Sequence, residues 1–309
     1  MLSALNLTKQ YGNVLSADSL TFTIEKGEVV GLLGANGAGK STTMNMITGC
    51  IPPSSGTVMV FGHDLHQDPI PAKRHIGYLP EIPPLYTDMT VTEQLRFACA
   101  LRSVTKSARR SEVDRVCELV NIGDMRKRMI RQLSKGYRQR VGMAQALVGS
   151  PELLIFDEPT AGLDPKQIID IRQLILKLKE SHTIILSSHI LAEITSGCTR
   201  LLIMKGGKLV ADSTPEQLGN AHAGGNQVEL RVKGGEEQVR PLLAAIPGVA
   251  EFILEASPEP GCVDVLVTAQ QGKDLREAIF LALAAASCPA VMMRPAKPTL
   301  EEIFIRLTA

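Results

Sequence analysis

A glycine-rich stretch decides the fold of this chain: Gly34-Ala35-Asn36-Gly37-Ala38-Gly39-Lys40-Ser41, directly after the apolar run Val29–Leu33. It fits the pattern GxxxxGK[ST] without a mismatch and leads into a helical pattern, which is the context this motif requires. Glycine allows backbone conformations and close approaches that a side chain would block. Successive N–H groups can then point at phosphate oxygens, beside the positive end of a helix. The stretch predicts a phosphate-binding loop, and the alternative is a chance glycine turn before a helix.

Three side chains at the end of this stretch have roles that follow from phosphate chemistry. Lys40 is expected to reach the β- and γ-phosphates of a nucleotide, and the Ser41 hydroxyl is expected to bind Mg²⁺. Thr42 can add a phosphate contact. The predicted nucleotide-binding residues of the loop are therefore Gly34, Ala35, Asn36, Gly37, Ala38, Gly39, Lys40, Ser41 and Thr42.

An unbroken apolar run, Leu153–Phe156, ends in two adjacent acids, Asp157 and Glu158. A buried parallel strand delivers the side chains at its carboxyl end to the crevice where a nucleotide binds. Asp157 is therefore expected to hold Mg²⁺, directly or through water, and Glu158 to orient and polarise the attacking water. The alternative is that the acids merely cap the next helix. A small-molecule kinase would need an acceptor pocket, whereas a glutamate beside the metal-binding aspartate favours a hydrolase.

Short apolar runs rich in β-branched residues recur on both sides of the loop, and helical patterns such as Ile168–Lys179 separate several of them. The runs are Thr21–Ile24, Val29–Leu33, Leu153–Phe156, Thr183–Leu186 and Leu201–Met204. This alternation predicts an α/β fold with a largely parallel sheet. Turns at Lys26-Gly27 and Gly206-Gly207 predict antiparallel hairpins beside it. Between about residues 85 and 150 the strand signals vanish, which predicts a helical insertion with helices at Thr92–Arg102 and Ser111–Val120.

With 309 residues, the chain is long enough for one large domain and one small domain. A polar, glycine-rich stretch at 219–226 is interpreted as a linker between a first domain at 1–218 and a second at 227–309. The second domain shows Val228–Val232, Glu236–Ala245, Ala250–Glu255, Cys262–Thr268, Asp274–Ala286 and Ala290–Arg294 in the order β-α-β-β-α-β. This order predicts a small α+β domain of the ferredoxin-like kind. A last helix, Thr299–Arg306, has Thr299 as its expected N-cap.

Composition excludes several classes of protein. Lys plus Arg number 33 and Asp plus Glu number 32, and this net charge of +1 argues against a dedicated nucleic-acid binder. The N-terminus lacks the apolar core of a signal peptide. The longest uncharged run, Ala278–Met293, falls short of the roughly 20 apolar residues that span a membrane, so it is interpreted as a buried helix followed by a buried strand.

The six scattered cysteines form no CxxC pair and are interpreted as reduced thiols.

Further motifs stand around the two acids. Leu133-Ser134-Lys135-Gly136-Tyr137-Arg138-Gln139-Arg140 precedes the acidic strand, Gly162-Leu163-Asp164-Pro165 follows it, and Ser187-Ser188-His189 comes after the next strand. The first motif resembles the LSGGQ signature of ABC ATPases, and the whole set stands in the order of that family. The resemblance covers residues 1 to about 215. It implies a P-loop NTPase core with an antiparallel β subdomain and a helical insertion, which binds ATP with Mg²⁺ and hydrolyses it.

The resemblance implies a role for each matching residue. Tyr11 matches the aromatic residue that stacks on adenine, and an ordinary surface tyrosine is the alternative. Ser134 and Gly136 match groups that contact the γ-phosphate of ATP held by the opposite subunit. Asp164 matches a loop that crosses the dimer interface. His189 matches the switch histidine that contacts the γ-phosphate and helps to position the attacking water.

Two places depart from the usual family pattern. Lys135 and Tyr137 replace the usual glycine and glutamine of the signature, although Ser134 and Gly136 are present. Glu81 replaces the usual glutamine and offers a charged oxygen ligand to Mg²⁺, and coupling to the partner alone is the alternative. With the appended C-terminal domain, these departures resemble the ABC-2-type exporters, most closely the ATPase associated with bacterial gliding motility.

The resemblance also implies an assembly. Because one chain holds one phosphate loop and one signature, two copies are expected to close head-to-tail over two ATP molecules. A separate polytopic transmembrane permease is the second implied partner, docking near Ile82–Leu95, where a packed loop is the alternative. The implied location is cytoplasmic, peripheral on the cytoplasmic face of the bacterial inner membrane. A rival class, soluble ABC proteins of translation or DNA repair, would need a second cassette in the same chain or a long coiled coil.

Overall fold

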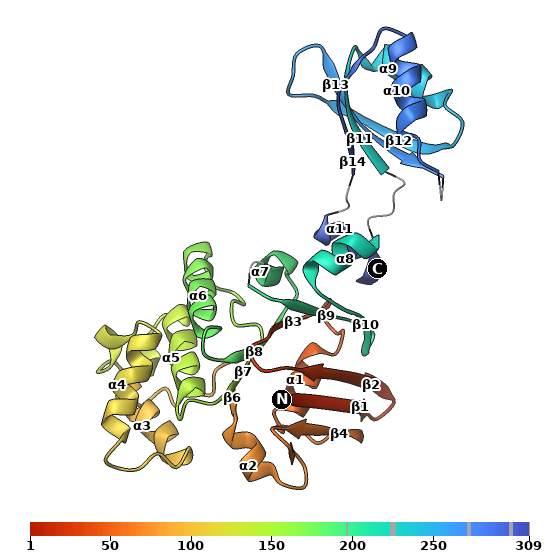
Figure 1. Cartoon of the computed structure of the whole chain (residues 1–309). Helices are drawn as coiled ribbons and strands as arrows, with labels where there is room; N and C mark the ends of the chain where they lie inside the picture. Colours follow the sequence, from red (N-terminus) through yellow and green to blue (C-terminus); the bar gives the residue numbers. More distant parts are fainter. Residues whose placement is uncertain (196, 223–226, 271–272, 297–298, 309) are drawn as a thin grey trace. The chain divides into compact units, whose positions relative to one another are not determined.

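The computed structural model describes residues 1–195, 197–222, 227–270, 273–296 and 299–308 (Figure 1). They form two compact units: Met1–Pro215 together with the end of the chain from Phe304, and Glu216–Ile303. These boundaries differ from the expected domains at 1–218 and 227–309. Residues 219–222 of the expected linker belong instead to helix α8 (Pro215–His222), which begins with proline at a favourable first position. Residues 223–226 lie outside the described part of the chain.

A six-stranded sheet in the order β10-β9-β3-β8-β7-β6 forms the centre of the first unit. Its strands are β3 (Val29–Leu33), β6 (Ile76–Leu79), β7 (Leu153–Phe156), β8 (Thr183–Ser188), β9 (Arg200–Lys205) and β10 (Lys208–Ser213). Neighbouring strands are parallel except β10, which returns antiparallel to β9 after Gly206-Gly207. Every residue of β3 and β7 is buried, as expected of parallel strands covered on both faces. The predicted parallel sheet and the Gly206-Gly207 hairpin are confirmed.

A second, antiparallel sheet has the order β2-β1-β4-β5. Its strands are β1 (Leu2–Tyr11), β2 (Val14–Ile24), β4 (Ser55–Val60) and β5 (His63–Asp64). One apolar core joins both sheets and helix α1 (Lys40–Ile47), and it includes Leu2, Leu20, Leu32, Met44 and Ile155. The hairpin predicted at Lys26-Gly27 is wrong, because this turn leads from β2 in one sheet to β3 in the other. The fully buried β3 needs hydrogen-bonding partners on both edges, and β8 and β9 supply them.

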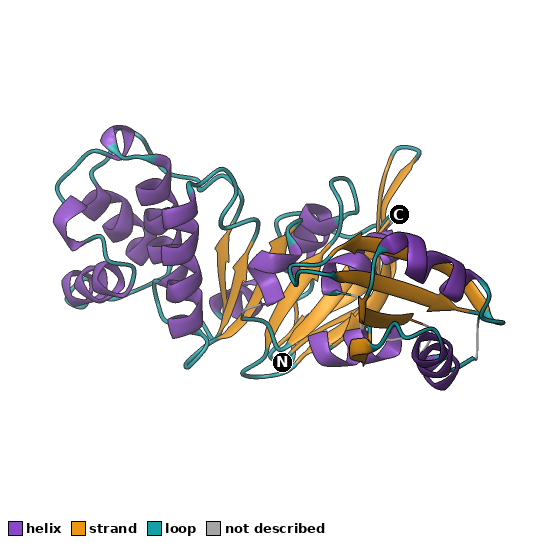
Figure 2. Cartoon of the chain, turned by 90° about the horizontal axis from the view of Figure 1, so that it is seen from above, coloured by secondary structure: helices purple, strands orange, loops and turns teal. Residues whose placement is uncertain are grey.

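Three helices fill the region of the predicted helical insertion: α3 (Val91–Leu101), α4 (Arg109–Leu119) and α5 (Lys135–Leu147). They pack on one another, α5 also packs against β6, and Figure 2 shows them as a separate group of helices. A capping box starts α3, in which Thr90 and Glu93 bond reciprocally. Outside this group, α2 (Pro69–Arg74) precedes β6, while α6 (Pro165–Leu178) and α7 (Leu191–Thr195) follow β7 and β8.

The second unit contains a four-stranded sheet in the order β12-β13-β11-β14, with every neighbouring pair antiparallel. Its elements are β11 (Gln227–Lys233), α9 (Glu236–Ala244), β12 (Val249–Ala256), β13 (Cys262–Ala269), α10 (Arg276–Ala285) and β14 (Ala290–Pro295). Strands and helices share a core of their own. The β-α-β-β-α-β order and this strand arrangement confirm the predicted ferredoxin-like fold. The last helix, α11 (Leu300–Thr308), begins with reciprocal hydrogen bonds between Thr299 and Glu302.

Helix α10 corrects one expectation. The run Ala278–Met293 is expected to form a buried helix and a buried strand, but α10 buries only Ile279 and Leu283, and no residue of β14 is buried. Phe280 is 57% and Leu281 is 58% exposed, because the helix covers the sheet with a single face. No described helix is long and apolar enough to cross a membrane. All six cysteines are free thiols.

Candidate active site

The glycine-rich loop joins β3 to α1, and its backbone requires glycine at two positions. Gly37 and Gly39 have φ angles of 81° and 99°, in the left-handed region that side chains disfavour. A Cβ atom on Gly39 would also lie 2.2 Å from the backbone oxygen of Ser16. The loop can hold this shape only because both residues are glycines.

The start of α1 has features that suit an anion. Gly39 occupies its N-cap position and supplies no side-chain hydrogen bond to the first turn. The first N–H groups of a helix lack partners within the helix, and the helix dipole favours negative charge there. The buried Lys40 curls back over the loop, where its Nζ donates to the carbonyl oxygens of Gly34 (2.8 Å) and Ala35 (3.3 Å). The glycines, the helix start and the buried ammonium together fit a chain of phosphates.

A cavity of about 350 Å³ beside the loop gathers residues from distant parts of the chain. It is lined by Ser16, Asn36, Gly37, Gly39, Lys40, Ser41, Thr42, Glu81, Glu158, Ala161 and His189. The loop, Glu81, Glu158 and His189 follow the carboxyl ends of β3, β6, β7 and β8, which are strands of one sheet. Ligands bind at this edge of parallel sheets, so the topology explains why these side chains meet.

Asp157 follows β7 and is held by hydroxyl groups. It is only 3% exposed, and its Oδ1 accepts a hydrogen bond from Ser187 Oγ at 2.5 Å. Burial raises the pKa of Asp157 above its ordinary value, although hydrogen bonds from Ser187 and Ser41 oppose the rise. A buried carboxylate beside a serine hydroxyl is a set of hard oxygen donors, and this set fits Mg²⁺.

Glu158 has a left-handed backbone, with φ of 46°. This conformation costs a residue with a side chain on the order of 1–3 kcal/mol and persists only where the surroundings enforce it. Its N–H donates to Ser187 Oγ at 2.8 Å. The carboxylate lies between two nitrogens, with Oε1 3.6 Å from Lys40 Nζ and Oε2 2.9 Å from His189 Nδ1. Since Glu158 is buried, these contacts hold its carboxylate at the cavity wall.

Two predicted contacts are less closely tied to this cavity. Glu81 lines it but is exposed, so its role as a Mg²⁺ ligand stays a prediction. Tyr11 is 48% exposed, and Lys9 Nζ lies 5.2 Å from the centre of its ring. Tyr11 is not among the residues that line the cavity, and adenine stacking on it also stays a prediction.

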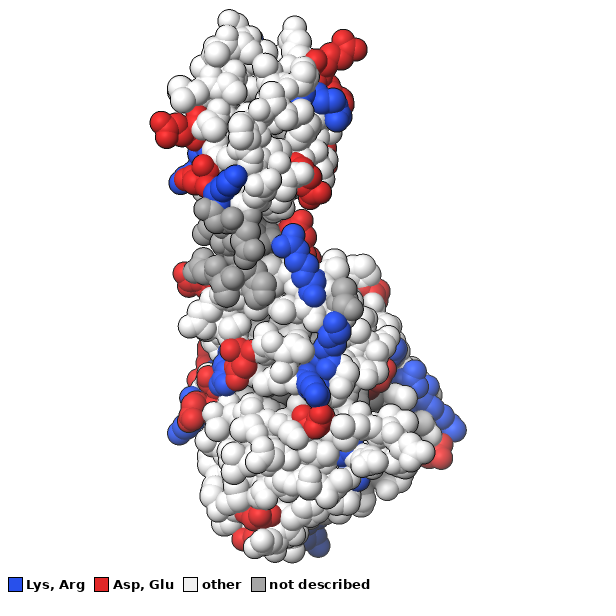
Figure 3. All heavy atoms as spheres, turned by 90° about the vertical axis from the view of Figure 1, so that its right-hand side faces the viewer, with Lys and Arg blue, Asp and Glu red and all other residues white. Residues whose placement is uncertain are grey.

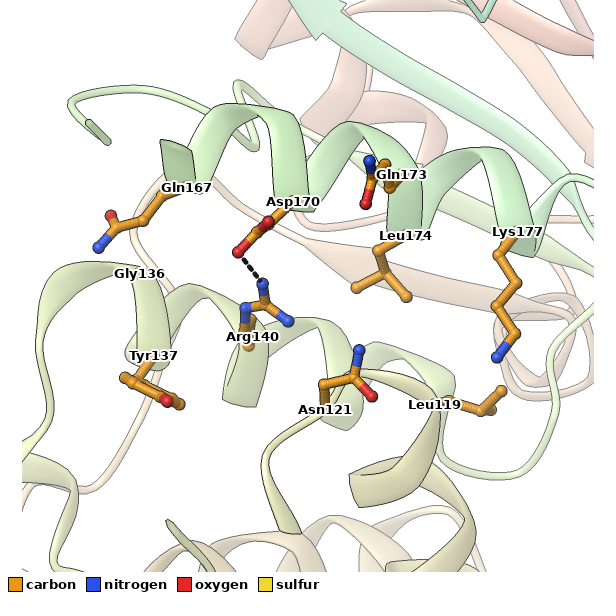
Figure 4. A pocket seen from close by; sticks show the side chains of 10 residues that line it. All are labelled: Leu119, Asn121, Gly136, Tyr137, Arg140, Gln167, Asp170, Gln173, Leu174 and Lys177. Atoms are coloured by element: carbon orange, nitrogen blue, oxygen red, sulfur yellow. Dashed lines mark hydrogen bonds and ion pairs between the residues drawn. The ribbon is translucent and has the colours of Figure 1, made fainter. Parts of the chain in front are cut away.

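Ser134, Gly136 and Asp164 lie at the starts of α5 and α6, outside this cavity. Ser134 Oγ accepts a hydrogen bond from the N–H of Tyr137 (3.4 Å), and Asp164 Oδ1 accepts one from the N–H of Gln167 (2.9 Å). The Gln167 side chain lies so close to Gly136 that a Cβ there would come within 2.7 Å of it. Figure 4 shows α5 and α6 on either side of a second cavity, of about 480 Å³, which Gly136 and Gln167 help to line.

An ion pair joins α5 to α6. Arg140 Nη2 lies 2.9 Å from Asp170 Oδ2, the dashed contact in Figure 4, and Arg140 Nη1 donates to the backbone oxygen of Val120 at 3.0 Å. The Arg140 side chain is 15% and the Asp170 side chain 42% exposed, so solvent screens the pair in part. The two helices whose starts carry Ser134 and Asp164 are therefore linked directly.

Three residues at the site were assigned no role from sequence. Ser16 and Ala161 line the cavity, and Ser187 contacts both acids. A serine near the end of the buried strand β8 was a usable signal, because β8 is the parallel neighbour of β7. Ser16 comes from the antiparallel sheet, and no local pattern in the sequence brings it to the loop.

Comparisons with known proteins identify the family. A family model described as ABC transporter matches residues 17–161. The linearmycin resistance ATP-binding protein LnrL of Bacillus subtilis is 31% identical over 100% of this chain and 98% of its own length. The bacitracin transport ATP-binding protein BcrA of Bacillus licheniformis is 38% identical over 69% of each chain. This chain belongs to the ABC transporter family.

The solved structures extend this assignment from sequence to fold. The ATP-binding cassette MJ0796, in a dimeric post-hydrolysis state bound to ADP and Pi, is 25% identical with a TM-score of 0.63. The match covers 69% of this chain and 98% of that one. The protein is therefore the ATP-binding and ATP-hydrolysing subunit of an ABC transporter, and the predicted P-loop NTPase core is confirmed.

Proposed function

We propose that this ABC ATPase powers export as a head-to-tail homodimer beneath a separate polytopic permease. One observation carries the dimer: the phosphate loop, Glu158 and His189 share a cavity, whereas Ser134, Gly136 and Asp164 lie outside it. ATP in that cavity would need the signature residues of a second copy to be enclosed on both sides. In a two-fold dimer, each copy would place its signature residues against the ATP bound by the other copy, so both ATP sites would be completed. The dimeric state of MJ0796 supports the same arrangement.

The side chains around the cavity fit hydrolysis of the γ-phosphate. Glu158 orients the attacking water and accepts its proton. His189, which is hydrogen bonded to the Glu158 carboxylate, contacts the γ-phosphate and helps to position that water. Lys40 binds the β- and γ-phosphates, while the loop N–H groups and Thr42 hold the remaining phosphate oxygens. Tyr11 stacks on adenine.

Ser41 and Asp157 would hold Mg²⁺, with Glu81 as a further ligand. The Ser41 hydroxyl lies near enough to the Asp157 carboxylate to lower its pKa, so the two groups could share one ion. An ion held by these residues would neutralise the negative charge that develops on the phosphates during hydrolysis. The residues Gly34, Ala35, Asn36, Gly37, Ala38 and Gly39 contribute backbone to the cradle.

The names of the relatives support export through a membrane partner. LnrL is named for linearmycin resistance and BcrA for bacitracin transport. Glu81, Lys135 and Tyr137 resemble the ABC-2-type exporters in particular, and the finer likeness to the gliding-motility ATPase remains a likeness of motifs. The subunit would lie in the cytoplasm, on the cytoplasmic face of the bacterial inner membrane, held there by its permease.

An exposed apolar surface after β6 suits a helix of the permease. Ile82 is 82% exposed, Tyr86 54% and Leu101 71%. A cavity of about 540 Å³ opens there, and Tyr86, Phe97 and Leu101 are among the residues that line it. Ile82 directly follows Glu81, which lines the nucleotide cavity, so movement at one surface has a short path to the other.

Two substitutions test the homodimer. Glu158→Gln should still bind ATP but hydrolyse it on the order of 10²–10⁴-fold more slowly, because the water loses its base. The unhydrolysed ATP should then hold two chains together, which light scattering would record as a doubled mass. Adding Ser134→Asp should abolish this dimer, since a carboxylate would face the γ-phosphate held by the other chain. Aspartate is a good N-cap, so the start of α5 is preserved.

Ser107→Asp in the Glu158→Gln background is the matched control, because Ser107 is exposed in a turn before α4, and it should leave the dimer intact. Normal hydrolysis by Glu158→Gln, or a dimer that survives Ser134→Asp, would refute the arrangement. Affinity purification from solubilised membranes tests the partner. A multispanning protein should copurify, whereas ribosomes or DNA would support the rival class.

A further inference from the structure

Glu193, in the short helix α7, connects the two segments that carry the catalytic residues. Its Oε2 accepts a hydrogen bond from Thr160 Oγ1 at 2.6 Å and another from Ser188 Oγ at 2.9 Å. Thr160 follows Glu158 by two residues, and Ser188 immediately precedes His189. One carboxylate oxygen therefore joins the segment of the glutamate to the segment of the histidine.

These hydrogen bonds are shielded from solvent. Thr160 is 6% and Ser188 is 1% exposed, while Glu193 is half-buried. Hydrogen bonds to an ionised acceptor are shorter and stronger than those between neutral groups. Removing the acceptor would leave two buried hydroxyls to find new partners, and both segments would be free to shift.

The backbone of Glu158 explains why its segment needs an anchor on each side. The left-handed conformation at this residue is strained and persists only when the surroundings over-determine it. On the N-terminal side, Ser187 accepts the hydrogen bond of the Glu158 N–H. On the C-terminal side, the bond from Thr160 to Glu193 supplies the second anchor.

Alternation along β8 gives its two serines different partners. Successive side chains of a strand point to opposite faces of the sheet. The hydroxyl of Ser187 accordingly donates a hydrogen bond to Asp157, whereas the hydroxyl of Ser188 donates one to Glu193. Ser188 Oγ also accepts a hydrogen bond from the N–H of Ile190 at 3.0 Å, which closes the turn that contains His189. The position of His189 thus depends on Ser188, and that of Ser188 on Glu193.

We propose that Glu193 is a positioning residue for ATP hydrolysis, which sets the separation between the Glu158 carboxylate and the His189 imidazole through Thr160 and Ser188. Glu193 is not among the residues that line the nucleotide cavity, so it acts through the other two. The inference rests on the proposed function, because it takes Glu158 and His189 to act on the same water.

Steady-state hydrolysis by Glu193→Gln and Glu193→Ala is the central test. Both hydrogen bonds end on one oxygen, and an amide oxygen can accept two, so glutamine should keep at least about half of the wild-type kcat. Alanine should lower kcat on the order of 10-fold or more, because small misplacements of catalytic groups are costly. The Kd for ATP depends on the loop and Lys40, so it should change less than about twofold. A purely structural role would not separate kcat from Kd in this way.

Thr160→Val and Ser188→Ala remove the two donors while Glu193 stays in place, so they decide the question even if Glu193→Ala does not fold. Each single variant should lower kcat. Adding Glu193→Ala to the double variant Thr160→Val/Ser188→Ala should cause no further loss of kcat. Glu180→Ala, an exposed glutamate just after α6, is the matched control and should leave kcat unchanged. Wild-type kcat in Glu193→Ala, equal losses in the alanine and glutamine variants, or fully additive losses would overturn the proposal.

Hydrogen–deuterium exchange without nucleotide separates this inference from the proposed function. The amides of Ala161 and Ile190 should exchange faster in Glu193→Ala than in the wild type or in Glu193→Gln. This comparison needs neither ATP nor a dimer. A wild-type chain that never dimerises would therefore remove the proposed function and leave this result to stand, whereas unchanged exchange in Glu193→Ala would overturn the inference alone.

Discussion

Two carboxylate side chains at the active site are buried, and each lies beside a hydroxyl group or an oppositely charged group. Asp157 is buried beside Ser187 and Ser41, while Glu158 lies between Lys40 and His189. A buried carboxylate without such partners would be strongly unfavourable. The hydroxyls only partly offset the burial of Asp157, since its pKa remains raised.

Asp157→Asn should raise the Tm of the chain at neutral pH in the absence of nucleotide and Mg²⁺. Burial raises the pKa of Asp157 in the folded chain above its unfolded value of 3.8. A raised pKa favours folding below the unfolded value, and this contribution is lost as the pH rises through the folded value. Asparagine stays neutral, and its oxygen can still accept the hydrogen bond from Ser187.

The Tm advantage of Asp157→Asn should therefore be largest near about pH 8 and shrink as the pH falls towards about 4. Differential scanning fluorimetry across this range measures it. Asp124→Asn, at an exposed position, is the control and should show no such trend. A Tm difference that is the same at both ends of the range would contradict the burial argument.

At the scale of elements, local patterns locate strands and helices but do not choose their partners. The phosphate loop, the acids after β7 and His189 after β8 could be placed from sequence, because each stands at the end of an apolar run. The turn at Lys26-Gly27 is equally clear in the sequence, yet it leads into a different sheet. Ser187 could be placed near the acids from its position at the end of β8, but its individual hydrogen bonds and those of Glu193 could not be predicted, since they depend on how β7, β8 and α7 lie against one another.

Arg140→Met should loosen α5 from α6. The substitution removes the ion pair with Asp170 and the hydrogen bond to the Val120 oxygen, and bonds of a charged group typically contribute about 1.5–3 kcal/mol. Urea unfolding should record a loss of this order, and ATP-dependent dimerisation of the Glu158→Gln chain should weaken. Arg138→Met, at an exposed position on the same helix, is the control. Equal stability of the two methionine variants would show that the ion pair contributes nothing.

On the scale of the whole molecule, the described residues of each unit include a hydrophobic core cluster of their own, and the two clusters share no residue. Chains with separate cores do not have to unfold in a single transition. The β-α-β-β-α-β order of the second unit was predictable from sequence, because its elements are short and follow one another with small gaps. The boundary of the second unit was harder to predict from sequence, since helix α8 occupies part of a stretch whose composition is typical of a linker.

Leu283→Ala should destabilise the second unit while sparing ATP binding. Leu283 is fully buried in the core of that unit, and truncating a buried leucine to alanine costs about 2–5 kcal/mol. Calorimetry should show one shifted transition, and ATP should still protect the first unit. Leu281→Ala removes the same atoms two residues away from an exposed position and should shift nothing. A common shift of both units in Leu283→Ala would mean that the chain unfolds as one.

The left-handed backbone of Glu158 sets stability against activity at one position. Replacing Glu158 by glycine would relieve the backbone strain, so a screen for expression or heat resistance would favour this substitution. The same substitution would abolish ATP turnover. The most stable variant of this chain and the catalytically active one therefore have different sequences. Thermostabilised variants of such a subunit should be assayed for turnover before any of them is used as a stand-in for the natural protein.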